Sequence, residues 1–386
     1  MQPSKQRFGW WLAATAAAVL VGCGSDDDDR VRFANVISFG DSYSDAGTYQ
    51  VGTVKTLGGG KFTVNGPNGL TWTEVLTNMV GAPPQCPAQT GMLPNNGTVG
   101  APVRDFANCF NYAQGSARIS SSGSGPNGVA LQTALGDQNL GFMAVSLKQQ
   151  FEAHLAKAGG SYARNDLVTV NGGGNDAFMQ LAAVANAAGG GAAAVATGTV
   201  AGWPQATLNL VAQGGAAAVD AAGAAAVAAM GQAGAEQAGY VKALVLAKGA
   251  THVLVRNLGN LNITPFGLAS DAATRGLISA MTQAFNNGLA NGLAGSGGVI
   301  LYDDYKQSND IAADPAKYGL GNVTTPACGP NAFGQPVGPS IVCNSGNLIA
   351  GDTSRFAFAD AVHPTPLVHR ITAQTAMTLL QQAGWQ

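Results

Sequence analysis

Short apolar segments of strand length alternate along the chain with longer segments in which apolar residues recur at helical spacing. The short segments lack the strict apolar–polar alternation of a sheet that keeps one face in water. Such a pattern is typical of a parallel sheet covered by helices on both faces. The expected strands lie at 31–39, 166–170, 251–256 and 298–302, and the expected helices at 71–80, 145–158 and 365–382.

No linker long enough to divide the chain separates these segments, so we expect a single α/β domain over 31–386. Two stretches interrupt the pattern. The first, about 181–250, is rich in Ala, the best helix former, and is broken at pairs of Gly. Asp220, Gln213 and the many glycines of this stretch argue against a membrane span. We expect an Ala-rich helical insertion there, and a second, irregular insertion at about 306–356.

Composition narrows the classes of partner and compartment. Gly contributes 54 of the 386 residues, and charged residues make up only 10% of the chain, against averages of about 7% and about 25%. Lys and Arg number 19 while Asp and Glu number 21, so the chain lacks the basic excess that neutralises nucleic-acid phosphates. We therefore expect no nucleic acid as a partner. Sparse charge, small polar residues and five cysteines suggest an exported protein.

The N-terminus has the layout of an export signal. Lys5 and Arg7 precede an apolar segment at 10–21, which is shorter than the about 20 residues that span a bilayer. The segment ends in Leu-Val-Gly-Cys at 20–23, which resembles the lipobox of bacterial lipoprotein signal peptides. The resemblance implies that the signal peptide 1–22 is removed and that the thiol after it is lipidated. The alternative is a plain secretory signal with an incidental Cys.

The lipidated residue would be Cys23, and it is followed by Gly24 rather than Asp. By the rule for such lipoproteins, this favours the outer membrane. We therefore expect an exported bacterial lipoprotein held at a membrane by an N-terminal lipid anchor, at the outer membrane or cell surface or in the periplasm, or else secreted. Several acyl chains would anchor it firmly, because one chain binds only marginally. The acidic run Asp26–Asp29 is interpreted as part of a solvated spacer, 23–30.

Four further cysteines remain, an even number that predicts two disulfides in an oxidising compartment. Four cysteines allow three connectivities. We favour the sequence-local one, which closes short loops in Gly/Pro-rich segments and pairs Cys86 with Cys109 and Cys328 with Cys343. Zinc is disfavoured because the chain has no C-x-x-C and no His near these cysteines. We expect no metal site.

The search for a general base is short, since the chain has only four His. His363 stands out because it lies in the segment Asp360-Ala-Val-His363-Pro364. Pro364 biases the residue before it away from helical backbone angles, so the imidazole is expected on a loop. A three-residue spacing within a turn lets the Asp360 carboxylate reach Nδ1 of His363. That contact fixes the tautomer and leaves Nε2 free to take a proton.

A nucleophile for this base is expected at Ser42. It lies in Phe-Gly-Asp-Ser-Tyr-Ser-Asp at 39–45, directly after the first expected strand. Ligands of doubly wound sheets bind outside the carboxyl ends of the strands, so a Ser after the tight turn at Gly40 would be exposed there. The alternative is that Asp41 and Ser42 cap the next helix. No G-x-S-x-G elbow occurs in the chain, which argues against an ordinary α/β-hydrolase.

Acyl transfer also needs hydrogen-bond donors directed at an oxyanion. Gly115, in the segment 111–117, offers an N–H with no side chain to block approach. Asn175, in Gly-Gly-Asn-Asp at 173–176, follows an expected strand and can project its amide over the same sheet edge. Each segment alone is as often a turn as a site, but all of them in this order are a far more specific signal.

These segments resemble the motif blocks of the GDSL, or SGNH, hydrolase superfamily. Gly40-Asp41-Ser42 matches the first block, Gly115 the second, 173–176 the third and Asp360-x-x-His363 the last. Further similarity to the lecithinase/haemolysin-like branch lies in Gly-Lys-Phe-Thr-Val-Asn-Gly-Pro at 60–67 and Trp-Thr-Glu at 72–74. One departure is Tyr43, where the common motif has Leu.

The resemblance implies a flavodoxin-like three-layer sandwich, the SGNH hydrolase fold, with a five-stranded parallel sheet. It implies a serine esterase or lipase, a carboxylic ester hydrolase in which Ser42 is the nucleophile, His363 the base and Asp360 the residue that orients the base. The oxyanion hole would comprise the N–H groups of Ser42 and Gly115 and the Asn175 amide. No metal or organic cofactor is implied.

The substrate implied by the resemblance is a lipid-like or small ester with a short-to-medium acyl chain. Three alternatives stay open at this point. The chain could be an acyltransferase that shares the acyl-enzyme step, or a carbohydrate esterase on the same fold. It could also be a non-catalytic surface lipoprotein that uses the same cleft to bind glycan or lipid.

Overall fold

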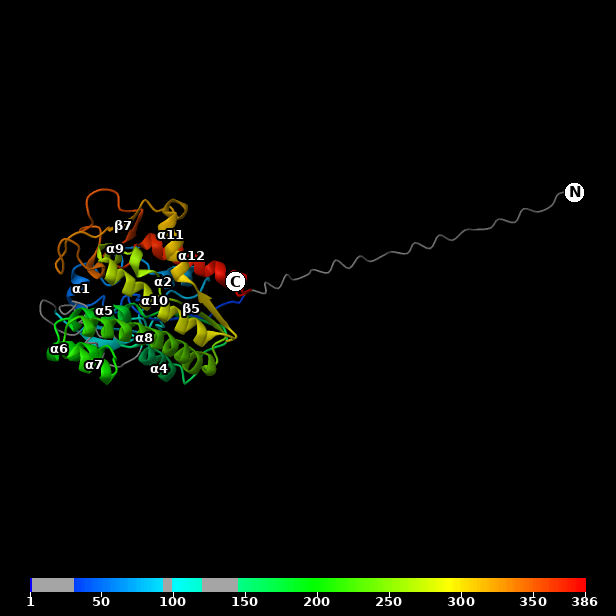
Figure 1. The fold of residues 1–386 in the computed structure, drawn as a ribbon. Helices are drawn as coiled ribbons and strands as arrows, with labels where there is room; N and C mark the ends of the chain where they lie inside the picture. The colour runs from blue at the N-terminus through cyan, green and yellow to red at the C-terminus, as the bar shows by residue number, and fades with distance from the viewer. Residues whose placement is uncertain (2–30, 93–98, 120–144) are drawn as a thin grey trace.

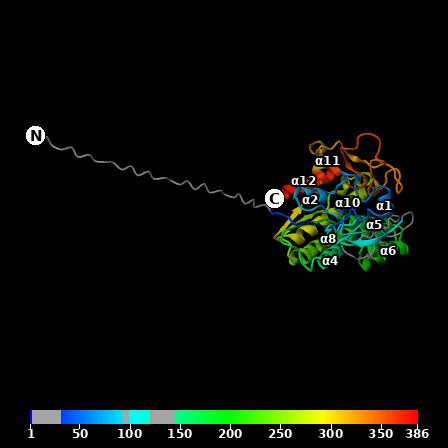
Figure 2. The same cartoon turned by 180° about the vertical axis from the view of Figure 1, so that it is seen from behind.

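The computed structural model of the chain describes Met1 and residues 31–92, 99–119 and 145–386. The predicted signal peptide 1–22, the lipidation site Cys23 and the spacer 23–30 lie outside the described residues and stay predictions. Figures 1 and 2 show the fold from two opposite sides, with helices stacked above and below a central sheet.

Four parallel strands form the central sheet, and each falls on one of the apolar segments that the sequence pattern predicts. In spatial order they are β1 (Asn35–Phe39), β4 (Asp166–Val170), β5 (His252–Arg256) and β6 (Val299–Tyr302). Every neighbouring pair is parallel. The carboxyl ends of all four strands therefore lie along one edge of the sheet, which is where a doubly wound fold places its ligand.

The prediction of five strands is one too many for the central sheet in the part of the chain that is described. A fifth segment does lie beside β1, where Ser38 N–H donates to Phe110 O at 3.0 Å and Tyr112 N–H donates to Ser38 O at 2.7 Å. It forms only an isolated bridge to β1. The ladder is interrupted because the Gly40 N–H donates to Gln150 Oε1 at 2.8 Å instead of to this segment, although Gln114 N–H still donates to Gly40 O at 3.1 Å.

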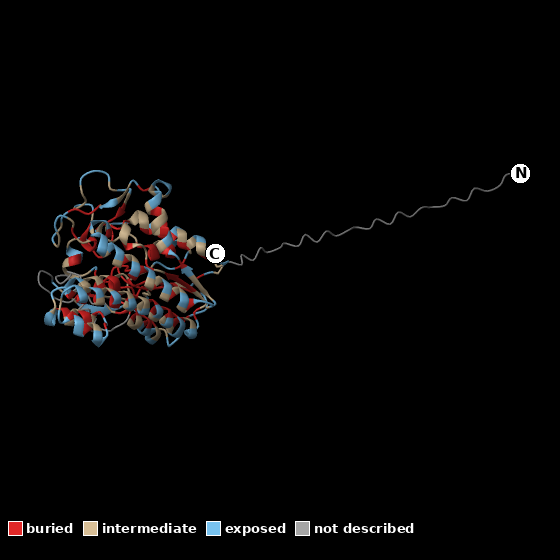
Figure 3. Ribbon diagram, in the orientation of Figure 1, coloured by how far each residue is buried: buried red, intermediate tan, exposed pale blue. Residues whose placement is uncertain are grey.

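Successive strand residues face opposite sides of the sheet and build two separate cores. Ile37 and Val168 belong to the larger core, whereas Val36 and Leu167 belong to the smaller one. Figure 3 shows the buried residues concentrated between the layers. The three-layer sandwich is therefore confirmed. Helices α4 (Leu147–Lys157), α5 (Gly174–Ala187), α8 (Ala216–Tyr240) and α10 (Ala272–Leu293) cover the first face, and α2 (Trp72–Met79) and α12 (Pro366–Gln382) the second.

Local capping sets where these helices begin. Ser146 precedes α4 in a capping box, in which its N–H donates to Gln149 Oε1 at 3.1 Å. Asp271 caps α10, because its carboxylate accepts the N–H of Thr274 at 2.7 Å. Pro366 is the first residue of α12, a position where a missing N–H leaves no bond unmade. The caps of α4 and α10 satisfy backbone donors that a first helical turn leaves without intrahelical partners.

The Ala-rich stretch forms the predicted helical insertion. It holds the end of α5, then α6 (Gly191–Val200), α7 (Gln205–Val211) and the 25-residue α8. Small residues let α8 approach α10 closely, since a Cβ on Gly234 would lie 2.1 Å from Phe285 O. The continuous helical segment Ala216–Lys248, which includes the π turn η1 (Val241–Val245) and η2 (Leu246–Lys248), could cross a membrane by length and composition alone. Here α8 packs against α5 and α10.

The stretch 306–356 is more regular than predicted. Most of α11 (Asp304–Ala313) lies in it, and β7 (Asn322–Pro326) pairs in parallel with β8 (Phe356–Phe358), the strand that leads to Asp360. The predicted insertion therefore begins inside a helix and supports one loop of the candidate site. The remaining elements are α1 (Gly52–Thr56), the antiparallel pair β2 (Gln89–Met92) and β3 (Ala101–Asp105), η3 (Leu261–Ile263), α9 (Pro265–Ala269), η4 (Pro315–Tyr318) and η5 (Ser340–Val342).

The two disulfides follow the connectivity that the sequence favours. Cys86 pairs with Cys109, and Cys328 pairs with Cys343. The first bridge lies beside the bridged segment next to β1, since Asn111 N–H donates to Cys86 O at 3.2 Å. The second ties the loop before β8 to the loop that follows β7, so the prediction of two local disulfides is confirmed.

Candidate active site

The turn after β1 carries the predicted nucleophile. Gly40 has φ +156°, and a Cβ there would lie 2.2 Å from Asn171 Oδ1, so only Gly fits this close approach. Ser42 follows at the carboxyl edge of the sheet and lines a cavity there. The alternative role, capping of the next helix, does not apply, because α1 begins at Gly52 after an N-cap at Val51.

The structure brings Ser42 together with the predicted base and its orienting carboxylate. Ser42 Oγ lies 2.9 Å from His363 Nε2. On the other side of the ring, Nδ1 lies 2.8 Å from Asp360 Oδ2 and 3.0 Å from Oδ1. Each link has hydrogen-bond length. A carboxylate at Nδ1 holds the proton on that nitrogen, so that Nε2 faces the serine as an acceptor.

Backbone N–H groups hold the Asp360 carboxylate in place. Oδ2 accepts the N–H of Ser340 at 2.8 Å, and Oδ1 accepts those of Val362 at 3.0 Å and His363 at 2.8 Å. Burial alone would raise the pKa of Asp360, but the positive charge of a protonated His363 and these hydrogen bonds hold it well below its usual range. The group that orients the base is therefore ionised.

Asn175 lies in the first turn of α5, at the edge of the cavity that Ser42 lines. The residue before this helix, Gly173, has φ +100°, and a Cβ there would lie 2.6 Å from the ring of Phe285. The Asn175 amide donates to Ala117 O at 2.9 Å. An amide has two N–H donors, so this bond fixes the group and leaves a second donor for a ligand.

Gly115 occupies a different place from the one its expected role requires. Its N–H donates to Asp45 Oδ2 at 2.9 Å, and Gly115 is not among the residues that line the cavity. The lack of a side chain serves packing instead, since a Cβ there would lie 2.1 Å from the ring of Phe62. With this N–H committed to a carboxylate, the expected donor is not directed at an oxyanion.

Ser116, the next residue, occupies the position beside the cavity that the sequence analysis expected for Gly115. It lines the cavity together with Ser42 and Asn175. Its φ of +68° lies in the left-handed region, where it is the one non-Gly residue of the described parts of the chain. Within those parts, neither its N–H nor that of Ser42 has a hydrogen-bond acceptor. Nothing in the local sequence predicts a left-handed backbone at a serine. The sequence analysis therefore assigned the donor to Gly115, one residue earlier.

The cavity beside Ser42 has a volume of about 310 Å³. One wall is polar and includes Arg256, Asp304 and Gln307. Much of the rest of the wall is apolar and includes Phe178, Leu258, Leu261, Ile263, Phe266 and Val362. A concave site with an apolar wall and a few polar groups is the usual form of a small-molecule site.

Two of the other histidines, His154 and His369, are buried in structural surroundings. His154 is buried beside Tyr112, with Nδ1 3.2 Å from its hydroxyl, and burial lowers the pKa of His154 to about 4. His369 is buried and accepts the N–H of Trp72 at Nδ1, and burial lowers the pKa of His369 to about 3.

Within the described residues, no group of three or more His, Cys, Asp or Glu side chains could hold a metal ion.

Comparison with known families agrees with this geometry. The family model of the GDSL-like lipases and acylhydrolases matches residues 36–376. The chain belongs to this family. It is also similar to a GDSL esterase/lipase of Arabidopsis thaliana, with 25% identity over 133 residues. That alignment covers 32% of this chain and 35% of the relative, so the chain spans about a third of the length of the curated relative it matches.

Membership in the GDSL-like lipase/acylhydrolase family supports an ester-hydrolysing activity in general. It also agrees with the α/β fold and its parallel central sheet. The matched range contains both loops that carry Ser42 and His363, as well as the Ala-rich insertion.

Proposed function

We propose that the protein is a serine carboxylic-ester hydrolase, an esterase or lipase that forms an acyl-enzyme on Ser42. The observation that carries the proposal is the continuous chain of contacts from Ser42 Oγ through His363 to Asp360, at 2.9 and 2.8 Å. As Oγ attacks the ester carbonyl carbon, Nε2 of His363 takes its proton. Asp360 keeps the ring in the tautomer that can do so and stabilises the imidazolium that forms.

The reaction then proceeds in two balanced halves. The tetrahedral intermediate collapses when the bond to the alcohol oxygen breaks and His363 gives its proton to that oxygen. The acyl group stays on Ser42 as an ester. A water molecule then attacks the acyl carbonyl with His363 again as base, and the proton returns to Ser42 Oγ as the carboxylic acid leaves.

Three donors are proposed for the oxyanion. The N–H groups of Ser42 and Ser116 have no acceptor within the described residues, and both residues line the cavity. The second N–H of the Asn175 amide completes the set, because the first is held by Ala117 O. Gly115 supports this arrangement through its bond to Asp45 instead of donating to the oxyanion.

The apolar wall of the cavity supports an acyl ester as the substrate class. Phe178 lies three residues after Asn175 on α5, so its side chain shares a helix face with the proposed oxyanion donor. Its ring packs edge-on against Phe266 of α9, at 5.2 Å between centroids. An acyl chain that leaves the carbonyl along this wall would be desolvated by both rings, and a cavity of about 310 Å³ suits a short-to-medium chain.

The proposal is tested by labelling the full chain with a fluorophosphonate and mapping the adduct by mass spectrometry. We expect a single adduct on Ser42 that Ser42→Ala abolishes, together with hydrolysis of p-nitrophenyl esters. A panel of these esters with graded acyl lengths then reports the preferred chain. Wild-type protein that is folded but neither labels nor hydrolyses any ester would show that the proposed activity is wrong.

The same assay separates the alternative activities. Added acceptor alcohols would divert the acyl group into new esters if the protein is an acyltransferase, and acetylated sugars would be the best substrates if it is a carbohydrate esterase. A protein that binds glycan or lipid in the cavity but never labels would be a binding protein.

We also propose that the protein is exported and anchored at a membrane through a lipid on Cys23. Two disulfides support an oxidising compartment. Expression in a bacterial host with an alkyne-tagged fatty acid tests the anchor. The tag should appear on the wild-type chain in the membrane fraction and should disappear with Cys23→Ser, whereas a soluble, untagged wild-type protein would support the plain secretory signal.

A further inference from the structure

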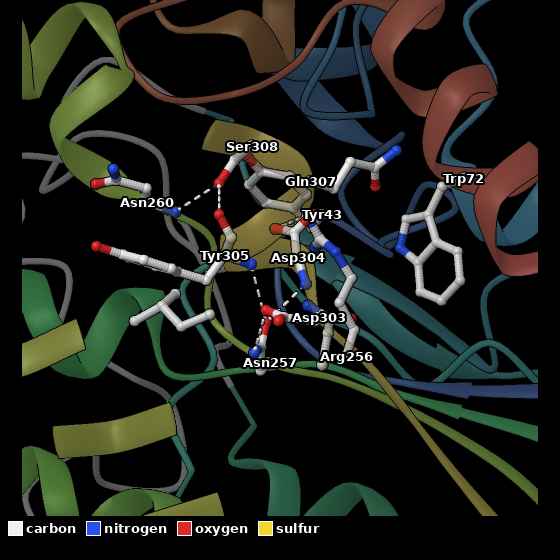
Figure 4. A network of polar contacts seen from close by, with 12 residues as sticks. Tyr43, Trp72, Arg256, Asn257, Asn260, Asp303, Asp304, Tyr305, Gln307 and Ser308 are labelled. Carbon is white, nitrogen blue, oxygen red and sulfur yellow. Dashed lines mark hydrogen bonds and ion pairs between the residues drawn. The ribbon is translucent and has the colours of Figure 1, made fainter. Parts of the chain in front are cut away.

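Tyr43, the residue that follows the nucleophile, contacts three other parts of the candidate site. Its hydroxyl donates to Val362 O at 3.3 Å, and its N–H donates to Asp41 Oδ1 at 3.1 Å. Its ring faces the guanidinium of Arg256, whose Cζ lies 4.5 Å from the ring centroid. Figure 4 shows Tyr43 beside Arg256 and Asp304 at the end of the sheet.

The rings of Tyr43 and His363 also lie 6.4 Å apart between centroids. Two hydrogen bonds further join the nucleophile loop to the loop of the base. One is the bond between Ser42 Oγ and His363 Nε2, and the other runs from the Tyr43 hydroxyl to the carbonyl of Val362. Tyr43 directly follows Ser42 in the sequence, and Val362 directly precedes His363, so the two hydrogen bonds join neighbouring residues of the same two loops. Ser42 and His363 are 321 positions apart in the sequence. The distance between their side chains in space therefore depends on such contacts between the loops.

Arg256 holds the ring of Tyr43 from the side of the sheet. It is the last residue of β5, and its Nη2 donates to Asp304 Oδ2 at 2.6 Å, with only 7% and 9% of the two side chains exposed. Burial alone would lower the pKa of Arg256, but the nearby charge of Asp304 outweighs it and raises that pKa. A desolvated cation over an aromatic face is a stronger contact than an exposed one.

Asp304 is itself fixed, so the ion pair has a rigid base. It is the first residue of α11, and its N–H donates to Asn257 Oδ1 at 2.7 Å. Asn257 also donates to Asp303 Oδ1 at 3.0 Å, and Figure 4 shows these contacts between the end of β5 and the start of α11. Gly259 leaves room for the carboxylate, because a Cβ there would lie 2.4 Å from Asp304 Oδ2.

We propose that Tyr43 is a positioning residue that sets His363 relative to Ser42 through Val362, and that the Arg256–Asp304 ion pair holds Tyr43 in place. A Leu at this position could neither donate to Val362 nor hold the cation over an aromatic face. The inference rests on the proposed function, because positioning is measured as turnover. Displacement of a catalytic group by about 1 Å can reduce a rate by about 10²-fold.

Two substitutions separate the contacts of Tyr43. Tyr43→Phe removes only the bond to Val362, and we expect kcat to fall about fivefold with KM unchanged, the effect of one ordinary hydrogen bond. Tyr43→Leu also removes the ring beneath Arg256, and we expect kcat to fall about 10²-fold. The rate of fluorophosphonate labelling of Ser42 should fall in parallel, because the base is displaced in the first half-reaction.

A matched control is available outside the loops that carry Ser42 and His363. Tyr318 also carries a cation over its ring, with Lys317 Nζ 5.3 Å from the centroid, and does not line the cavity. Tyr318→Leu should leave kcat, KM and the labelling rate at wild-type values. Circular dichroism of each variant reports whether the fold is kept.

The ion pair is tested without leaving a buried charge alone. The double variant Arg256→Met with Asp304→Leu removes both charges and keeps apolar volume, a change that buried pairs often tolerate. We expect it to fold and to lose about tenfold in kcat. Adding Tyr43→Leu to it should then reduce kcat by less than in the wild-type background, because coupled residues are not additive. Arg256→Lys, which keeps a cation, should retain more activity than the double variant.

The results that contradict the inference differ from those that contradict the proposed function. Folded Tyr43→Phe and Tyr43→Leu variants with wild-type kcat and labelling rates would overturn it, as would a double variant with wild-type kcat. Tyr43 also lines the cavity, so a rise in KM for longer acyl chains at unchanged kcat would assign it to substrate binding instead of positioning, and would also overturn the inference. Absence of labelling in the wild-type protein would instead refute the esterase itself.

Discussion

The carboxylate of Asp45 accepts the N–H of Gly115 at 2.9 Å, across 70 positions of sequence. The same carboxylate accepts the N–H groups of Gly47 at 2.9 Å and Thr48 at 2.7 Å. Asp45 therefore joins the loop of the nucleophile to the loop that presents Ser116 to the cavity. Burial raises the pKa of Asp45 to about 6, although these three hydrogen bonds oppose the rise.

This raised pKa predicts that Asp45 lowers the stability of the folded protein as the pH increases. Its folded-state pKa of about 6 lies above the ordinary value of 3.8, so the native state binds more protons than the unfolded state between about pH 4 and 6. Stability from this group is therefore present below pH 4 and falls as pH rises through 6, by about 3 kcal/mol in total. Urea unfolding at pH 4, 5, 6 and 7 measures it.

Asp45→Asn isolates this effect because an amide does not titrate. From pH 4 to pH 7, the free energy of unfolding of the wild type should fall by about 3 kcal/mol relative to that of Asp45→Asn. Asp271→Asn is the control, since a hydrogen bond from the Thr274 N–H lowers the pKa of Asp271. A lowered pKa places the loss of stability below about pH 4, so the difference for Asp271→Asn should stay nearly constant from pH 4 to pH 7. A constant difference for Asp45→Asn across this range would contradict the prediction.

The parts of the site that sequence alone predicts are those set by short spacings. Asp360 and His363 are three residues apart in one turn, so their contact follows from local geometry. Ser42 could be placed near them because it follows a strand whose carboxyl end lies on the ligand-binding edge. The donor at Gly115 could not be judged in this way, because its N–H is satisfied by Asp45 from a distant loop.

The fold shows the same division between local and distant effects. The four apolar segments predict the central strands to within a few residues, since burial on both faces dictates their composition. Strands β2, β3 and β7 lie in segments without a long apolar run or clear alternation, and β8 is only three apolar residues long, so all four form through pairing partners that the local pattern does not contain. The fifth central strand fails for a similar reason, because the Gly40 N–H donates to the side chain of Gln150, 110 positions away, instead of to the neighbouring segment.

The left-handed backbone of Ser116 predicts that Gly is tolerated there. A non-Gly residue in this region stores about 1 kcal/mol or more of strain, partly offset by the larger chain entropy that Gly loses on folding. Ser116→Gly keeps the N–H, so kcat should stay within about twofold and the protein should be equally or slightly more stable. Gly115→Ala places a Cβ 2.1 Å from the ring of Phe62 and should reduce both stability and kcat.

Thermal unfolding measures the stability of Ser116→Gly and Gly115→Ala, and ester hydrolysis measures their kcat. Loss of most activity in a folded Ser116→Gly would show that the Ser116 side chain, rather than its N–H, acts in the site. A crystal structure of the phosphonylated enzyme adds a geometric check. Its phosphoryl oxygen should lie within about 3 Å of the Ser116 nitrogen and farther from that of Gly115.

The second amide N–H of Asn175 predicts a large and specific loss of turnover. Asn175→Ala removes one oxyanion donor and should reduce kcat by about 10²–10³-fold with little change in KM. Asn186→Ala is a matched control, because Asn186 lies exposed near the end of the same helix. An Asn175→Ala variant with wild-type kcat would remove the amide from the proposed mechanism.

The two disulfides are predicted to contribute similar stability but to affect activity differently. Cys328–Cys343 closes a loop of 15 positions and Cys86–Cys109 one of 23, for which loop-closure entropy gives about 3 kcal/mol in each case. The Cys328–Cys343 bridge is coupled to Asp360, the carboxylate that orients the base. Cys328 N–H donates to Ala359 O at 2.8 Å, and the Ser340 N–H donates to Asp360.

Replacing both cysteines of one bridge by Ser therefore separates stability from positioning. Both double variants should unfold at lower urea concentrations, by comparable amounts. Only Cys328→Ser with Cys343→Ser should also lose kcat, because the Ser340 N–H that holds Asp360 lies three residues before Cys343. Cys86→Ser with Cys109→Ser should keep wild-type kcat below its unfolding transition. Equal losses of kcat in the two variants would show that bridge 328–343 stabilises the fold without orienting the catalytic carboxylate.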